Sequence, residues 1–185
     1  MSSFAKDNTL IVKNNAKPLT DKDNTLIVET DPKSPISEAY RTLRTNIQFS
    51  SVDKKIQSIL ITSSGPGEGK STVAANLALT MAEGGKKAIL IDCDMRKPTI
   101  HKKFRIPNTS GLSNLLLKDL SIEQAAFKYT ESLYILPAGV IPPNPAEIIS
   151  SLKMKNFLKE LKKSFDYIII DSPPVIAVTD ALILS

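Results

Sequence analysis

The chain has 185 residues, of which 42% are hydrophobic and 23% charged, and its net charge is +5. These values predict one globular domain with a hydrophobic core and exclude a disordered or fibrous protein. The net charge is too small to indicate a nucleic-acid-binding protein, and no apolar run approaches the ~18 residues that a membrane span needs.

The cysteine content and the first residues bear on the cellular compartment. Cys93 is the only cysteine, so the chain forms no internal disulfide, as expected in a reducing cytoplasm. The opening residues, MSSFAKDNTL, lack the apolar segment of a signal peptide. We therefore expect a cytoplasmic protein that reaches a membrane only through a partner.

A short duplication marks the N-terminal region, residues 1–33. The segment KDNTLIVKN at 6–14 recurs as KDNTLIVET at 22–30, which is too short for a repeat fold. Each copy holds a β-prone TLIV piece among polar residues. We therefore predict a tail that is weakly ordered or adds an edge strand, ahead of a domain that covers residues 34–185.

Two helices of this domain are predicted from apolar stripes. Residues 35–49 have a proline in the first turn and apolar residues at helical spacing, namely Ile36, Tyr40, Leu43 and Ile47. Residues 154–165 carry a second stripe, formed by Met154, Phe157, Leu158 and Leu161. A shorter helix is predicted to begin at Ser121, because Gln124 follows it at capping-box spacing.

Short apolar runs alternate with the helical segments. They predict strands at 56–62, 87–92, 133–138 and 166–171, with further helices at 70–85 and from residue 175 onward. Continuous apolar strands between helices are typical of a parallel sheet covered on both faces. Ligands of such sheets bind at the carboxyl ends of the strands.

A glycine-rich loop precedes the helix at 70–85. SSGPGEGKST at 63–72 fits the phosphate-binding P-loop pattern, with Ser64 in place of its first glycine. Backbone N–H groups of such a loop surround a polyphosphate, and the helix start adds its positive dipole end. Lys70 is expected to reach the β- and γ-phosphates, Ser71 to bind Mg²⁺ and Thr72 to face the α-phosphate. The fold is therefore predicted to be P-loop NTPase-like, with ATP bound by Ser64, Gly65, Pro66, Gly67, Glu68, Gly69, Lys70, Ser71 and Thr72.

Acidic residues follow two of the predicted strands. Asp171 ends YIIID, as a metal-binding carboxylate would, and ILIDCDMR places Asp92 and Asp94 one residue apart. Because side chains alternate along an extended chain, we expect Asp92 and Asp94 to face the same Mg·ATP. Two close carboxylates repel each other, which favours a cation between them. Arg96 can neutralise phosphoryl charge.

Together these motifs resemble those of the bacterial tyrosine kinases, the cytoplasmic kinases of capsule and exopolysaccharide export. An apolar triplet followed by D-x-D-x-R matches ILIDCDMR, and a triplet followed by D-x-x-P matches IIIDSPP. The family's self-association motif, E-x-x-R-x-x-R, matches EAYRTLR through Glu38, Arg41 and Arg44. The resemblance covers residues 30–185 and stops before the last strands and the C-terminal tyrosine cluster of the family, so we expect a C-terminally incomplete kinase domain.

The resemblance implies transfer of the γ-phosphate of ATP to tyrosine, on the chain itself and on proteins of polysaccharide synthesis. Lys70 and Mg²⁺ would stabilise the transferred phosphoryl group, and Asp92 would be the base for the tyrosine hydroxyl. Ser71, Asp94 and Asp171 would organise the metal. The cytoplasmic tail of a membrane adaptor, a polysaccharide co-polymerase, would activate the kinase at the inner face of the plasma membrane.

Two other functions compete with this interpretation. A ParA/MinD-like ATPase switch would carry a signature lysine early in the P-loop, where this chain has Gly65. A truncated, non-catalytic subunit would still bind the adaptor, but the intact Lys70, Asp92, Asp94 and Asp171 argue against loss of the site. A small-molecule kinase would not explain the E-x-x-R-x-x-R motif.

Overall fold

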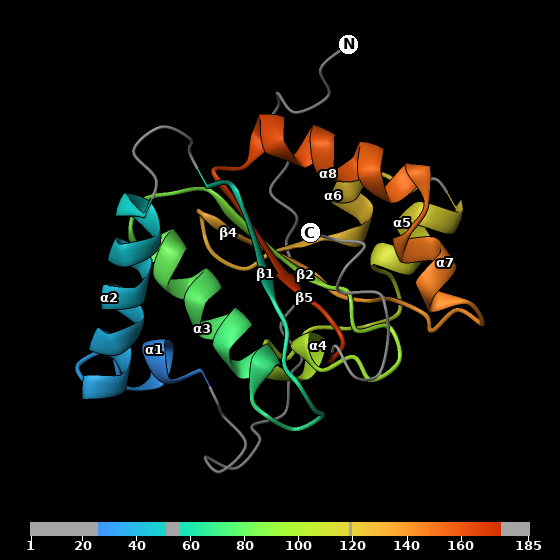
Figure 1. Ribbon diagram of the computed structural model, residues 1–185. Coiled ribbons are helices and arrows are strands. Elements are labelled where there is room, and N and C mark those ends of the chain that lie inside the picture. The colour runs from blue at the N-terminus through green and yellow to red at the C-terminus, as the bar shows by residue number, and fades with distance from the viewer. Residues whose placement is uncertain (1–25, 51–55, 119, 175–185) are drawn as a thin grey trace.

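The computed structural model describes residues 26–50, 56–118 and 120–174. Within these ranges, a five-stranded sheet lies between two layers of helices (Figure 1). The strands are β1 (Ser58–Ile61), β2 (Ala88–Asp92), β3 (Phe127–Lys128), β4 (Leu133–Leu136) and β5 (Tyr167–Asp171). The helices are α1 (Ile27–Thr30), α2 (Pro35–Phe49), α3 (Lys70–Glu83), α4 (Ile100–Lys103), α5 (Leu112–Lys118), α6 (Ile122–Ala125), α7 (Pro145–Ile149) and α8 (Leu152–Ser164).

The strand order of the sheet is β1-β5-β2-β4-β3. The first four strands are parallel, and β3 pairs antiparallel with β4. This arrangement confirms the predicted mostly parallel α/β fold, and all four parallel strands lie within their predicted ranges. The sequence did not predict β3, because it is only two residues long. The helix predicted from residue 175 lies outside the described residues.

Alternate residues of the central strands face different helix layers. In β2, Ala88 and Leu90 join the core beside α1 and α3, whereas Ile89 and Ile91 join the core beside α5, α7 and α8. β5 repeats the alternation over residues 167–170. Because both faces are covered, these strands have no charged residue before their final aspartate, and the sheet has a buried core on each side.

Residues 26–33 contain helix α1, so the prediction of a weakly ordered tail or an edge strand is wrong for them. Leu26 and Val28 are 2% and 1% exposed and pack beside α3. The backbone N–H of Val28 donates to Oδ1 of Asn76 on α3 at 3.1 Å. The β-prone segment is helical because burial against α3 outweighs its local preference. The first copy of the duplication lies outside the described residues.

Helix α2 has the predicted bounds, but only part of its apolar stripe is covered. The Ser34 hydroxyl caps its start by accepting a hydrogen bond from the backbone N–H of Ser37 at 3.2 Å. Tyr40 packs against the core, as does Ile47, whereas Ile36 is 57% exposed and Leu43 38% exposed. One line of contact with α3 is therefore enough to hold this peripheral helix, and the rest of its apolar face is open.

The remaining helix predictions hold. The core beside α8 contains the four predicted residues, Met154, Phe157, Leu158 and Leu161. Ser121 and Gln124 form the predicted capping box at the start of α6. Within the described residues, none of the helices combines the length and the hydrophobicity that crossing a bilayer demands.

Replacing Asn76 by alanine is expected to lower the free energy of unfolding by about 2 kcal/mol, because it leaves buried backbone groups unpaired. Asn76 is 0% exposed, accepts from Val28 and donates to the Thr72 carbonyl at 2.9 Å. Urea denaturation measures the change, with Asn46→Ala on the exposed side of α2 as control. Equal stability of the two variants would contradict the structural role of Asn76.

Candidate active site

Two acidic residues end neighbouring strands at one edge of the sheet. β2 and β5 pair in parallel, and their register places Asp92 beside Asp171. Both residues are 0% exposed. The glycine-rich loop before α3 and the short helix α4 lie at this same end of the sheet (Figure 1). The carboxyl edge of the sheet is therefore where the predicted site residues meet.

The loop between β1 and α3 has a conformation that depends on glycine. Gly67 and Gly69 have φ angles of 81° and 88°, in the left-handed region that favours glycine. Between them, Glu68 folds back over the loop. Its carboxylate accepts hydrogen bonds from the backbone N–H groups of Ser64 at 3.2 Å and Gly65 at 3.0 Å, and from the Ser64 hydroxyl at 2.8 Å. Glu68 thus closes the loop on itself, a contact that the P-loop pattern did not predict.

Lys70, the first residue of α3, lies among the acidic residues. Its Nζ donates to Asp94 Oδ2 at 2.8 Å and to Ser71 Oγ at 3.2 Å, and it lies 3.6 Å from Asp171 Oδ1. The side chains of Lys70 and Asp94 are only 10% and 7% exposed. Burial lowers the pKa of Lys70, but attraction to Asp171 and Asp94 outweighs it, so the pKa lies above its ordinary value. Lys70 therefore stays charged and balances these carboxylates.

Asp171 has the surroundings of a metal ligand. Both of its carboxylate oxygens are buried, and neither accepts a hydrogen bond from the residues that the structure describes. Burial raises the pKa of Asp171, and the Lys70 ammonium opposes this rise. A buried carboxylate without a donor is costly unless a cation shares the site. Asp171 therefore fits the predicted metal site together with Ser71 and Asp94.

The protein alone supplies an incomplete set of metal ligands. Across the described ranges, no three acidic, histidine or cysteine side chains converge closely enough to hold a metal ion. Mg²⁺ usually takes one or two carboxylates and fills its other positions with phosphate oxygens and water. The residues present thus fit a Mg²⁺ ion that arrives with a nucleotide, and they do not fit a permanently bound metal.

Asp92 and Asp94 bind different partners. The Asp92 carboxylate accepts from the backbone N–H groups of Asp94, Thr99 and Ile100, each at 3.1 Å. Asp94, in contrast, contacts Lys70. Strand β2 ends at Asp92, so the side-chain alternation on which the prediction relied does not extend to Asp94. In this structure Asp94 faces the phosphate loop, whereas Asp92 holds the start of α4.

The pKa of Asp92 is raised to about 8 by its burial and by the neighbouring Asp171, against the opposing hydrogen bond from Ile100. Asp92 therefore keeps its proton near neutral pH while no metal is bound. This protonation removes one negative charge from the edge of the sheet. It also explains how two aspartates can end adjacent strands without a cation between them.

Two further basic residues lie near the acidic segment or the loop. Arg96 is exposed, and its side chain makes no hydrogen bond or ion pair to any residue in the described ranges, so its part in neutralising phosphoryl charge stays a prediction. Lys103, which sequence reasoning missed, donates from Nζ to the Thr72 Oγ1 at 2.8 Å. Lys103 belongs to no P-loop or acidic motif, and only the fold brings it to the loop.

Replacing Glu68 by alanine is expected to weaken ADP binding about ten-fold, because the loop loses the contacts that preorganise it. Glu68→Gln keeps an acceptor oxygen and is expected to lose less. Isothermal titration calorimetry measures both, with the exposed Glu123→Ala on α6 as control. An unchanged or tighter affinity in Glu68→Ala would show that the carboxylate mainly repels phosphate.

The comparisons with known proteins agree with this geometry. A family described as "AAA domain" matches residues 54–185. The tyrosine-protein kinase YwqD of Bacillus subtilis is 54% identical over 156 residues, which are 84% of this chain and 66% of YwqD. The putative tyrosine-protein kinase CapB of Staphylococcus aureus is 48% identical over 152 residues, which are 81% of this chain and 66% of CapB. The crystal structure of the chimerical protein CapA2B2 is 48% identical, with a TM-score of 0.83 over 87% of this chain and 71% of its own.

The chain belongs to the bacterial tyrosine kinase family. It spans just under two thirds of the length of YwqD and of CapB. Kinases of this family share their fold with MinD ATPases. MinD of Pyrococcus horikoshii, solved with Mg-ADP, is 29% identical, with a TM-score of 0.57 over 69% of this chain and 53% of its own.

Position 65 bears on the difference between the kinase family and the ParA/MinD-like alternative. A Cβ atom added to Gly65 would lie 3.1 Å from Oε1 of Glu68, which is a tight contact. A side chain at this position, such as the signature lysine, would displace the Glu68 carboxylate. The closed loop of this kinase-family chain therefore depends on glycine at position 65.

The E-x-x-R-x-x-R motif of the kinase family lies on α2 and contacts α3 of the same chain. Arg41 pairs with Glu38 at 2.6 Å and with Glu83 at 3.3 Å. Arg44 donates to the Thr80 carbonyl at 2.9 Å. The motif thus holds α2 on α3, and its role in self-association stays a prediction.

Proposed function

We propose that the chain is the ATP-binding part of a protein-tyrosine kinase that phosphorylates itself and proteins of capsule or exopolysaccharide production. The observation that carries the proposal is the position of Lys70, held by Asp94 and Ser71 and 3.6 Å from the buried carboxylate of Asp171. Phosphoryl transfer depends mainly on positioning and on charge stabilisation, and these residues supply both at one edge of the sheet.

Each residue has a proposed role in this reaction. The backbone of the loop and Lys70 bind the phosphates of ATP, and Ser71, Asp94 and Asp171 hold Mg²⁺. The ion would neutralise charge that develops on the transferred group. Asp92 as the base for tyrosine stays a prediction. Its raised pKa would make it a stronger base once its proton is lost, whereas the proton that it holds in the nucleotide-free chain, its burial and its backbone hydrogen bonds suit a structural carboxylate.

The proposed partners follow from the family and from the exposed face of α2. Ile36, Leu43 and Phe49 are 57%, 38% and 77% exposed on this helix. Exposed apolar side chains on the helix that carries the E-x-x-R-x-x-R motif support self-association through α2. We further propose that the cytoplasmic tail of a membrane adaptor recruits and activates the kinase at the inner face of the plasma membrane.

A phosphorylation assay tests the proposal. The purified chain is incubated with labelled ATP, Mg²⁺, an adaptor-tail peptide and a tyrosine-containing protein. We expect phosphotyrosine to form only when Mg²⁺ is present. Release of phosphate without phosphotyrosine would contradict the kinase and support the ATPase switch. Adaptor binding with neither product would contradict it as well, and would support a non-catalytic subunit.

A further inference from the structure

A second lysine lies beside the phosphate loop and comes from outside its motif. Lys103, the last residue of α4, donates from Nζ to Oγ1 of Thr72 at 2.8 Å, just as Lys70 donates to Ser71. Two neighbouring hydroxyl groups at the start of α3 thus each accept from a lysine. We propose that Lys103 is a nucleotide-binding residue that contacts the α-phosphate beside Thr72, while Lys70 serves the outer phosphates. This inference rests on the proposed nucleotide site.

The fold holds Lys103 in place before any nucleotide binds. The Asp92 carboxylate accepts from the backbone N–H groups of Thr99 and Ile100, which fixes the start of α4. Ile100 is 0% exposed, and Phe104 is 4% exposed and packs edge-on against Tyr129, with ring centroids 4.9 Å apart. Both ends of the short helix are therefore anchored. A preorganised donor binds its ligand with less loss of conformational freedom.

The charges around Lys103 favour an anion at this position. Burial lowers the pKa of Lys103, as does the nearby Lys70 charge, whereas Asp171 opposes this. Two partly buried ammonium groups beside one loop repel each other, and a polyphosphate between them would relieve that repulsion. The arrangement therefore suits a nucleoside di- or triphosphate.

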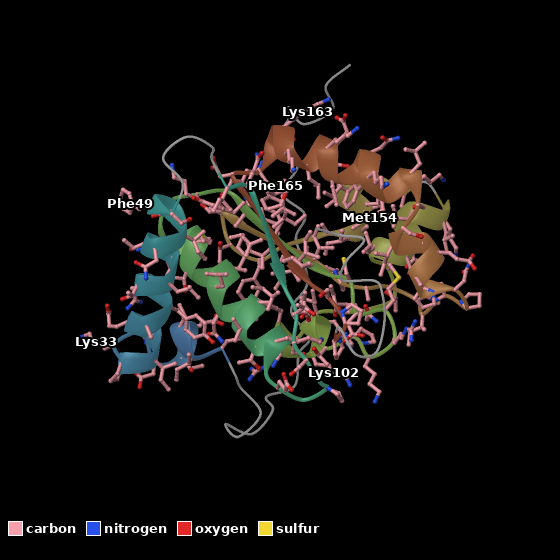
Figure 2. All side chains as sticks on the ribbon, viewed as in Figure 1. Lys33, Phe49, Lys102, Met154, Lys163 and Phe165 are labelled. Carbon is pink, nitrogen blue, oxygen red and sulfur yellow. The ribbon has the colours of Figure 1, made fainter. Side chains whose placement is uncertain are left out.

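Lys102 provides a matched control on the same helix. Lys102 is exposed, and Figure 2 shows it at the outer edge of the molecule. Its side chain makes no hydrogen bond or ion pair to the residues that the structure describes. Lys102→Met and Lys103→Met therefore remove the same charge from neighbouring positions, and only the second removes a contact to the phosphate loop.

Calorimetric titration of the full chain with ADP and with ATP, each with Mg²⁺, tests the inference. Lys103→Met is expected to weaken both nucleotides about ten-fold, because one charge-assisted hydrogen bond is lost. Lys103→Gln, which keeps a donor for Thr72 without the charge, is expected to lose nearly as much. Lys102→Met is expected to bind like the wild type. The affinities for ADP and for ATP are expected to fall equally, because the proposed contact is to the α-phosphate, which both nucleotides carry.

Several outcomes would overturn the inference. Wild-type affinity in Lys103→Met, an equal loss in Lys102→Met, or a loss for ATP alone would each do so. If Lys103 had only a structural role, the nucleotide-free Lys103→Gln variant would have a lower melting temperature than the wild type. ADP would then raise the melting temperature of the variant and of the wild type by the same amount. The proposed function fails separately, if the wild-type chain binds neither nucleotide.

Discussion

Replacing Lys70 by methionine is expected to reduce phosphotyrosine formation by about 1,000-fold, because the transferred phosphoryl group loses its nearest cation. The side chain that is lost lies 2.8 Å from Asp94 and 3.6 Å from Asp171, at the junction of the loop and both acidic segments. Methionine has nearly the same volume, so packing changes little. Initial rates of phosphotyrosine formation measure the effect, with the exposed Lys86→Met after α3 as control.

The same substitution is expected to destabilise the nucleotide-free chain by about 3 kcal/mol near neutral pH, because it leaves buried carboxylates without their cation. The loss should shrink in acid, where Asp171, whose pKa is raised by burial, takes up a proton. Urea denaturation at two pH values separates this effect from the loss of catalysis. A variant that is inactive and yet equally stable at both pH values would contradict the role of Lys70 as the internal counter-ion.

The stability of the nucleotide-free chain is expected to fall as the pH rises from about 4 to about 8, because the native state holds a proton that the unfolded state releases. Asp92 has its pKa raised from 3.8 to about 8 in the folded chain. Between these values the native state binds more protons than the unfolded state, so alkali favours unfolding. The slope attributable to one proton is at most about 1.4 kcal/mol per pH unit.

Asp92→Asn removes this titration and is expected to flatten the pH dependence, although it also weakens the contacts to α4. The variants are therefore compared by the slope of their unfolding free energy against pH, and their absolute stability is not used. Asp31→Asn, at an exposed position, is the control. Parallel slopes for Asp92→Asn and the wild type would show that Asp92 is already ionised in the folded chain.

The parts of the fold that could be predicted are those in which local pattern and burial agree. The central strands are covered on both faces and are therefore apolar up to their final aspartate, as in Ala88–Asp92. The glycine-rich loop could be recognised in the sequence because Gly67 and Gly69 adopt positive φ angles that other residues rarely adopt. Parallel strands bring their carboxyl ends to one edge, so Asp171 could be placed near the loop without a structure.

The parts that could not be predicted depend on contacts between distant segments. Leu26 and Val28 belong to a β-prone segment, and only the burial against α3 makes it helical. Asp92 and Asp94 were expected to face the same ligand, but the strand ends at Asp92, and the two carboxylates have different hydrogen-bond partners. Lys103 follows Lys70 by 33 positions in the chain, and no spacing rule connects the two. Their proximity arises from the packing of α4 against α3.

The contact between Lys70 and Asp94 makes nucleotide binding an exchange of partners. The lysine reaches a phosphate only by loosening its hold on a carboxylate of its own chain, so Asp94 competes with ATP for the same ammonium group. Part of the attraction between Lys70 and phosphate would therefore only replace the existing contact between Lys70 and Asp94. In the proposed kinase, such internal competition would limit how tightly the site retains ADP and would return the loop to a charge-balanced state as soon as the product leaves.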